Sequence, residues 1–327
     1  MTQPIPIRPQ KQTAPVSKFD LSKILTKAQR APYRLILWGV AGVGKTTFAA
    51  HAPNPIVLCA EQGAEEMDVA RTPLLETWEQ LGDVLAVLRE PEHEYKTLVV
   101  DSTTSLERLL HEYLCRTNGW RSMDELAFGK CHDAAIKEWR ALIQSMDFLR
   151  RSRQMNIILI GHSSTKPFKN PEGEDFDRYE LCLNKKAAEE LTNWCDAILF
   201  ARYELFTAEN KKRIRGVSTG ARIIHTQWNA AFTAKNRYSL PETLPLVYEE
   251  FAKAMDGAYS PEHIAGLKKQ IEEMRSQLVG TEHEGNISKG LSWAGEDPSK
   301  LRQVLDKLRG QAGLDGNADN NAVKGDQ

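Results

Sequence analysis

Short apolar runs alternate with longer amphipathic segments through the first part of the chain. The apolar runs are RLILW (34–38), PIVLCA (55–60), TLVVD (97–101) and NIILIG (156–161). Helical periodicity marks the intervening stretches 46–52, 77–89, 104–116 and 133–153. Because the apolar runs are continuous rather than alternating, they indicate strands that are buried on both faces. The pattern therefore predicts an α/β fold with a mainly parallel central sheet flanked by helices.

The pattern changes after Lys186. KKAAEELTNWC is typical of one helix, and it is followed by the β-like runs AILFARYELF, KRIRGV and ARIIHTQW, joined by AENKK and STG. Such runs, separated by turn signals, predict antiparallel strands that extend the sheet at its C-terminal part.

A small helical tail is predicted beyond the core. Apolar residues recur at three- and four-residue intervals from 261 to 278, and Asp297-Pro298 marks the start of a second short helix. Two such helices carry too little apolar content for a strong core of their own. We therefore expect the tail to dock on the core or to engage a partner.

These patterns divide the chain into four parts. They are a disordered, basic N-terminal arm (1–30), an α/β core (31–255), a small helical segment (256–310) and a disordered tail (311–327). The start of the arm is rich in Pro and Gln, and the final run, GLDGNADNNAVKGDQ, is poor in residues that build a core.

Composition narrows the class of protein. The chain has 327 residues, of which 41% are hydrophobic, and a formal net charge of -1. This charge excludes a globally basic protein that coats DNA, but it leaves room for a local basic patch. No apolar run approaches the ~20 residues that cross a bilayer, so no membrane partner is expected. The five scattered cysteines form no CxxC pair, which is typical of a reducing cytoplasm.

A phosphate-binding motif follows the first predicted strand. The stretch from Gly39 to Thr46 fits GxxxxGK[ST] and opens a predicted helix, which is the context that the motif requires. Its glycines let backbone N–H groups point at phosphate oxygens, Lys45 places a positive charge on the β- and γ-phosphates, and Thr46 offers a hydroxyl to Mg²⁺. ATP and Mg²⁺ are therefore the expected cofactors. The residues predicted to hold the nucleotide are Gly39, Val40, Ala41, Gly42, Val43, Gly44, Lys45, Thr46 and Thr47.

Two acids accompany this motif. Asp101 ends the apolar strand TLVVD, where a carboxylate can hold Mg²⁺ or its water; capping of the following helix is compatible with the same position. Glu61 comes just past the second predicted strand. A carboxylate in that place can orient the water that attacks the γ-phosphate, whereas the alternative is a loop-exposed acid.

The position of Glu61 resembles that of the catalytic acid in the RecA/DnaB class of P-loop proteins. That class carries a polar sensor at the end of a later strand, which implies a sensor role for His162 in NIILIGH. The pair Lys235 and Arg237, in FTAKNRYSLP, resembles the cationic finger that reaches the γ-phosphate of a neighbouring subunit. The alternatives are a surface histidine and a solvated basic turn.

Together, these elements resemble a narrower family, the phage RecA-like nucleotide-binding proteins that form the RecA-core branch of single-strand annealing proteins. The resemblance covers about residues 30–254, and the motif at 39–46, VVDS, ILIGH and AKNRYSLP carry it. It implies a RecA-like P-loop NTPase core and an oligomeric ATPase that binds single-stranded DNA and promotes annealing in the cytoplasm of an infected bacterium. It also implies work alongside a single-strand-binding protein, which the helical tail could engage.

Two segments are candidates for contact with DNA, because RecA-like cores turn two loops toward it. The first, CRTNGWRSMDELAFGKCHD, offers Arg121 and Lys130. The second, SSTKPFKNPEGEDFDRYELCLNKK, is expected to be a loop and offers Lys166, Phe168, Lys169 and Arg178. Aromatic and cationic side chains together suit single strands, because bases stack and phosphates pair. The acids of the second segment would repel phosphates unless they are turned away.

Other readings of the same motifs stay open. A motor or regulatory ATPase like DnaB or KaiC shares the Glu61 and Lys235/Arg237 features but would translocate or switch instead of pairing strands. A scaffold that binds nucleotide without hydrolysing it would use the tail to hold replication proteins.

Overall fold

The computed structural model describes residues 31–171, 173–210, 213–258, 260–277, 284–295 and 298–311. The predicted N-terminal arm, residues 312–327 of the predicted C-terminal tail and the helix cap at Asp297 lie outside the described residues. No helix in the described part of the chain is long and apolar enough to cross a membrane.

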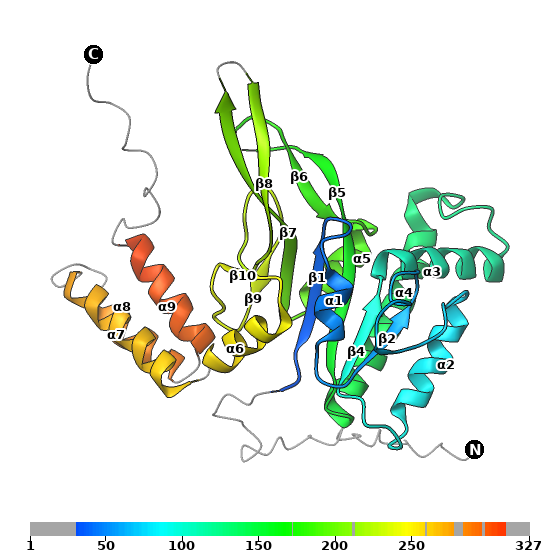
Figure 1. Cartoon of the computed structure of the whole chain (residues 1–327), viewed down its shortest axis with the longest axis horizontal. Helices are drawn as coiled ribbons and strands as arrows, with labels where there is room; N and C mark the ends of the chain where they lie inside the picture. Colours follow the sequence, from blue (N-terminus) through cyan, green and yellow to red (C-terminus); the bar gives the residue numbers. More distant parts are fainter. Residues whose placement is uncertain are drawn as a thin grey trace, which may run out of the picture.

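Ten strands in the described residues form one mixed sheet (Figure 1). They are β1 (Arg34–Gly39), β2 (Pro55–Cys59), β3 (Ala70–Arg71), β4 (Thr97–Asp101), β5 (Asn156–Phe168), β6 (Phe176–Leu181), β7 (Ala197–Asn210), β8 (Arg213–His225), β9 (Lys235–Asn236) and β10 (Thr243–Pro245). The order along the sheet is β10-β8-β7-β1-β5-β4-β2-β3, with β6 paired to β5 and β9 paired to β7. The strands from β7 to β3 in this order are parallel, and β8 and β10 add the antiparallel part.

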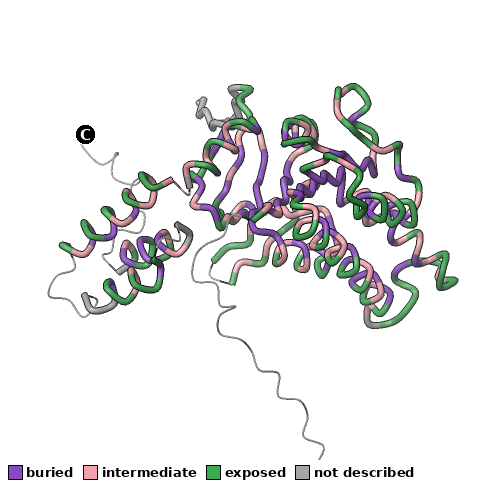
Figure 2. Tube along the Cα trace, turned by 90° about the horizontal axis from the view of Figure 1, so that it is seen from below, coloured by how far each residue is buried: buried purple, intermediate pink, exposed green. Residues whose placement is uncertain are grey.

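Helices cover both faces of this sheet. They are α1 (Lys45–Ala50), α2 (Trp78–Arg89), α3 (Thr103–Asn118), α4 (Lys130–Ser152), α5 (Lys185–Trp194), α6 (Tyr248–Ala258), α7 (Pro261–Gln277), α8 (Glu284–Ala294) and α9 (Pro298–Gln311), with a short 3₁₀ turn at Ala127–Gly129. In β1, Ile36 and Trp38 pack with α2, α3, α4 and α5, whereas Leu35 and Leu37 pack with α1 and α6 on the other face. The buried strands run through the middle of the molecule between these layers (Figure 2).

The predicted α/β architecture is therefore confirmed, with a central sheet whose parallel strands share one carboxyl edge. Each of the four apolar runs in the first part of the chain forms a strand that is largely buried. The antiparallel extension is also confirmed, although β8 continues through STG, where the sequence indicates a turn and where its pairing with β7 shifts register.

The segment after His162 differs from its prediction. We expected a loop, but β5 continues to Phe168 and pairs with β6 in an antiparallel hairpin, from Ser163↔Leu181 to Phe168↔Phe176. The strand signal is weak in the sequence because the positions of the hairpin are half buried or exposed, so polar side chains are mixed with aromatic ones. The loop prediction is therefore wrong.

The C-terminal segment forms a small helical unit of its own. Helices α7, α8 and α9 pack around a separate apolar cluster that includes Leu267, Ile271, Ile287, Leu301 and Leu305. Two corrections follow: the segment has a third helix, α8, and its three helices together bury an apolar cluster of their own. The unit lies beyond α6, on the side of the molecule away from α2 (Figure 1).

Candidate functional site

The predicted phosphate loop connects β1 to α1 at the carboxyl edge of the sheet. Gly42 and Gly44 adopt positive φ angles of 71° and 105°, which L-residues rarely adopt. At Gly39 a Cβ atom would lie 1.9 Å from the backbone oxygen of Ala201 in β7, so only glycine fits there. The loop therefore depends on glycine for its curvature and for its close approach to the neighbouring strand.

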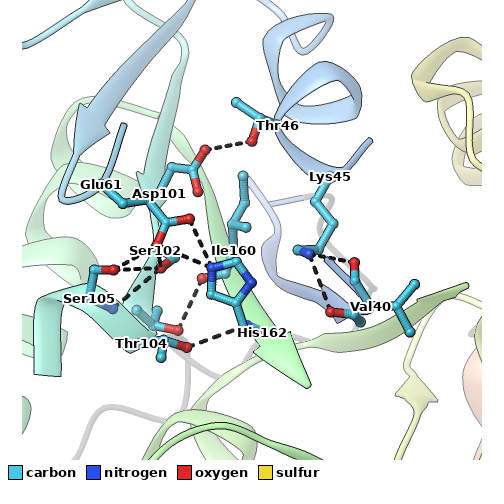
Figure 3. A network of polar contacts seen from close by, with 12 residues as sticks. Val40, Lys45, Thr46, Glu61, Asp101, Ser102, Thr104, Ser105, Ile160 and His162 are labelled. Atoms are coloured by element: carbon cyan, nitrogen blue, oxygen red, sulfur yellow. Dashed lines mark hydrogen bonds and ion pairs between the residues drawn. The ribbon is translucent and has the colours of Figure 1, made fainter. Parts of the chain in front are cut away.

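Lys45 lies folded across the loop. Its Nζ donates to the backbone oxygens of Val40 (2.9 Å) and Gly39 (3.2 Å), and the residue is only 5% exposed. Burial lowers the pKa of Lys45, and the nearby carboxylates of Asp101 and Glu61 oppose that shift. The ammonium group is thus held at the mouth of the loop, where it can exchange the carbonyl oxygens for phosphate oxygens (Figure 3).

Thr46 and Asp101 form a second polar pair beside the loop. The Thr46 hydroxyl donates to Asp101 Oδ2 at 2.6 Å. Burial raises the pKa of Asp101, which is 4% exposed, and the hydrogen bond from Thr46 opposes that shift. Among the described residues there is no group of three or more His, Cys, Asp or Glu side chains that could hold a metal ion. A hydroxyl and one carboxylate do suit Mg²⁺, which is held by few protein oxygens and takes the rest from phosphate and water.

Glu61 lies at the centre of a hydrogen-bond network. Its Oε2 accepts from the hydroxyls of Ser102 (2.7 Å) and Ser105 (2.6 Å), and its Oε1 lies 2.8 Å from Nε2 of His162 (Figure 3). Burial raises the pKa of Glu61, but the hydrogen bonds from His162, Ser105 and Ser102 outweigh it and lower the pKa from 4.5 to about 2. Glu61 is therefore ionised at any physiological pH and is held in one orientation.

The sheet order explains why these residues meet. Because β5, β4 and β2 are adjacent and parallel, His162 on β5, Asp101 at the end of β4 and Glu61 just past β2 come together at one edge. Ser102 and Ser105 belong to the start of α3, where Ser102 is the N-cap and accepts from the Ser105 N–H. The sequence analysis did not predict either serine as a partner of Glu61. Both serines come directly after the strand that ends in Asp101, and this position is the signal that could have identified them.

Lys235 and Arg237 lie away from the phosphate loop and the Glu61 network. Strand β9 pairs with the start of β7, through Ala197↔Asn236, and Arg237 forms an ion pair with Asp196 at 3.1 Å. Asp196 also binds Arg34, the first residue of β1, whereas the phosphate loop follows the last residue of that strand. The length of β1 thus separates the cationic pair from its own phosphate loop, roughly 15–20 Å at 3.3 Å per residue.

Four of the six candidate DNA contacts lie together. Lys166, Phe168, Lys169 and Arg178 all line a cavity of about 630 Å³ between the β5–β6 hairpin and α5. The guanidinium of Arg178 lies over the Phe168 ring, 5.0 Å from its centre. Two acids of the hairpin are turned toward its lysines, since Lys166 lies 3.9 Å from Glu180 and Lys169 pairs with Asp175.

The other two candidates are separate from that cavity. Arg121 follows α3, and its backbone N–H donates to the side chain of Glu125. Lys130 is the first residue of α4. The structure therefore brings four of the candidate residues together on the hairpin and places Arg121 and Lys130 apart from them.

The loop, its lysine, the Thr46–Asp101 pair and the Glu61 network define a P-loop NTPase. A comparison with protein-family models agrees: residues 31–238 match the AAA domain family AAA_24, and the chain belongs to this family. A search among curated proteins finds no match. Among solved structures, the RadB recombinase is similar at 14% sequence identity and a TM-score of 0.34, over 60% of this chain and 80% of that one.

Proposed function

We propose that the chain is an ATP-hydrolysing protein that assembles with copies of itself, binds single-stranded DNA and promotes annealing in phage recombination. One observation carries the proposal. Strand β5 holds His162 against Glu61 in the nucleotide site, and the same strand continues into the hairpin that bears Lys166 and Phe168. In this proposal, a structural change at the γ-phosphate is transmitted along this one strand to the candidate DNA surface.

Hydrolysis follows from the residues at the carboxyl edge of the sheet. The backbone N–H groups of the loop and Lys45 bind the phosphates, and Thr46 and Asp101 supply oxygen ligands for Mg²⁺, which neutralises charge on the phosphates when bound. Glu61 accepts a hydrogen bond from the attacking water and aims it at the γ-phosphate. Its low pKa means that it orients the water and leaves it largely undeprotonated until bond formation.

The hairpin provides the DNA surface in this proposal. Phe168 offers a stacking face, and Lys166, Lys169 and Arg178 offer cations around one cavity. The lysines are 51% and 89% exposed, so phosphate oxygens can displace the carboxylates that now pair with them. Exposed ion pairs of this kind contribute ~0–1 kcal/mol, which makes the exchange inexpensive.

Assembly completes the proposal. Lys235 and Arg237 cannot reach their own phosphate loop, and we propose that they serve the nucleotide of the next subunit as a cationic finger. The unit of residues 31–255 would be the ATPase core, working in the host cytoplasm, and the helices α7–α9 would engage a single-strand-binding protein. Trp293 on α8 is 55% exposed, although the ammonium group of Lys300 lies 5.3 Å from its ring centre, and it would anchor such a contact.

The direct test measures binding of a fluorescent single-stranded oligonucleotide over a salt series, with and without Mg²⁺ and ATP. We expect the slope of log affinity against log salt to fall by about 0.7 for each phosphate contact that is removed. The variant K166A/K169A should therefore bind weakly with a slope smaller by about 1.4. The matched control is K268A/K269A, which removes two lysines from α7, one half-buried and one exposed.

This assay, together with assays of duplex unwinding and of ATP turnover, separates the competing functions. Affinity that ignores both salt and K166A/K169A contradicts the hairpin as a DNA surface. Sustained unwinding of a forked duplex with ATP favours a motor. Turnover near zero, combined with nucleotide-dependent binding of a replication protein, favours a scaffold.

A further inference from the structure

Two side chains from the antiparallel part of the sheet contact the outside of the phosphate loop. Tyr203 on β7 and Arg222 on β8 are paired across the two strands. The Tyr203 hydroxyl donates to the backbone oxygen of Gly42 at 3.0 Å, and Arg222 NH1 lies 3.5 Å from the backbone oxygen of Val43. These residues are far from the loop in sequence, and no motif marks them.

Arg222 also lies close to Gly44, the last glycine of the loop. A Cβ atom at Gly44 would lie 2.9 Å from Arg222 NH1, so the guanidinium fills the space that the missing side chain leaves. Arg222 is exposed, and it forms no ion pair with an acid in the part of the chain that the structure describes. An unpaired guanidinium with several N–H donors is well suited to phosphate oxygens, which it can bind in a bidentate manner.

The sheet order indicates which end of the nucleotide Arg222 faces. His162 and Asp101 stand on β5 and β4, on one side of β1, and they define where the γ-phosphate and its attacking water lie. Arg222 stands on β8, on the opposite side of β1. The part of a nucleotide that lies toward β8 is therefore the end that carries the α-phosphate and the ribose.

We propose that Tyr203 and Arg222 form a positioning pair for the nucleotide. Tyr203 holds the loop through Gly42 so that its N–H groups face the phosphates, and Arg222 donates hydrogen bonds to phosphate oxygens at the nucleoside end. The ligand class is a nucleoside diphosphate or triphosphate, and the inference rests on the nucleotide binding proposed above. The geometry assigns these roles to the subunit that owns the loop, unlike the finger from a neighbour.

The test is calorimetric titration of the full chain with Mg²⁺–ATP and, separately, with Mg²⁺–ADP. We expect R222A to raise the Kd by about ten- to a hundredfold, as for loss of a charge-assisted hydrogen bond, and to do so equally for both nucleotides. R222K should give an intermediate Kd because lysine keeps the charge without the planar fork. Y203F should raise the Kd by about two- to tenfold, since it removes a neutral hydrogen bond to the loop.

The matched control is R202A, which removes an arginine from the adjacent position of β7. Arg202 donates to His225 at 3.0 Å and makes no contact with the loop among the described residues, so R202A should leave both Kd values within about twofold. Thermal unfolding of each variant checks that it is folded. If R222A does not fold, R222K and R222Q decide the question in its place.

Three outcomes overturn the inference. They are Kd values for R222A that stay within about twofold of wild type, a loss confined to ATP, and a loss as large in R202A as in R222A. The proposed function fails differently: wild type itself would bind no nucleotide, or K45A would bind as well as wild type. If R222A binds nucleotide as wild type does and K45A does not, the result contradicts the positioning pair and leaves the proposed function standing.

Discussion

At the scale of single residues, the proposed mechanism makes hydrolysis of ATP depend on Glu61. The substitution E61Q keeps the size of the side chain and can still accept hydrogen bonds from Ser102 and Ser105, but it removes the charge that aims the water. We expect turnover to fall about 10²–10⁴-fold. Phosphate release measures the turnover, and Mg²⁺–ATP affinity should stay near the wild-type value. Turnover within tenfold of wild type would assign Glu61 to structure alone.

Glu61 also links stability to pH. Its pKa is lowered from 4.5 to about 2 in the folded protein, so the ionised form is favoured by folding. This stabilisation is complete above pH 4.5 and is lost as the pH falls from 4.5 toward 2. After a discount for solvent screening of the partly exposed side chain, its size is about 2 kcal/mol.

We therefore expect E61Q to be less stable than wild type by about 2 kcal/mol at pH 7 and to approach wild type as the pH falls below 4.5. Urea unfolding at a series of pH values measures the difference. A stability difference that does not change between pH 7 and pH 3 would contradict the low pKa.

Several of these residues could be predicted from the sequence, and others could not. The loop, Asp101 and Glu61 are predictable because each directly follows an apolar strand, and parallel strands bring such positions to one edge. Tyr203 is different, since 161 positions separate it from Gly42, whose backbone oxygen it binds. Contacts of this kind depend on the order and register of β7 and β1, which local pattern does not encode.

At the scale of elements, the β5–β6 hairpin connects the nucleotide site to the cavity that bears the DNA candidates. Its strands were not predictable because their polar sequence resembles a loop, and pairing between them outweighs the weak local signal. A paired hairpin transmits a backbone displacement better than a loop does, because hydrogen bonds hold its strands together. The backbone from Ser163 to Phe168 is held by the ladder that joins β5 to β6, and we expect this ladder to transmit a shift from one end to the other.

This relay makes a prediction about His162. The variant H162A should retain ATP binding through the loop but lose the dependence of DNA affinity on nucleotide, because the contact with Glu61 is gone. We expect the ratio of DNA affinities with and without ATP to approach one, where coupling between sites is typically ~5–150-fold. Oligonucleotide anisotropy measures this ratio. H162Q, which can still donate to Glu61, is the control and should preserve part of the coupling.

At the scale of the whole molecule, the proposed assembly completes the nucleotide site with residues of a neighbouring chain. The loop opens at the carboxyl edge of the sheet, and Lys235 and Arg237 stand near the start of β1 and β7. A head-to-tail assembly brings opposite ends of neighbouring copies together, which a two-fold dimer does not do. The side chain of Arg237 is 55% exposed, so it can leave Asp196 for a phosphate on the next copy.

Removal of the cationic pair should leave each subunit folded, because Asp196 keeps its ion pair with Arg34. If the finger reaches a neighbour, K235A/R237A and K45A should each lose turnover by about 10³-fold alone, the first through the finger and the second through the loop. Mixed in equal amounts, they should recover about one quarter of the wild-type turnover, because one interface in four joins an intact loop to an intact finger. Phosphate release from subunits mixed before assembly measures this recovery, with each variant alone at the same total concentration as the control. Mixtures that stay inactive, although light scattering shows mixed oligomers, would place the pair outside the site of the neighbour.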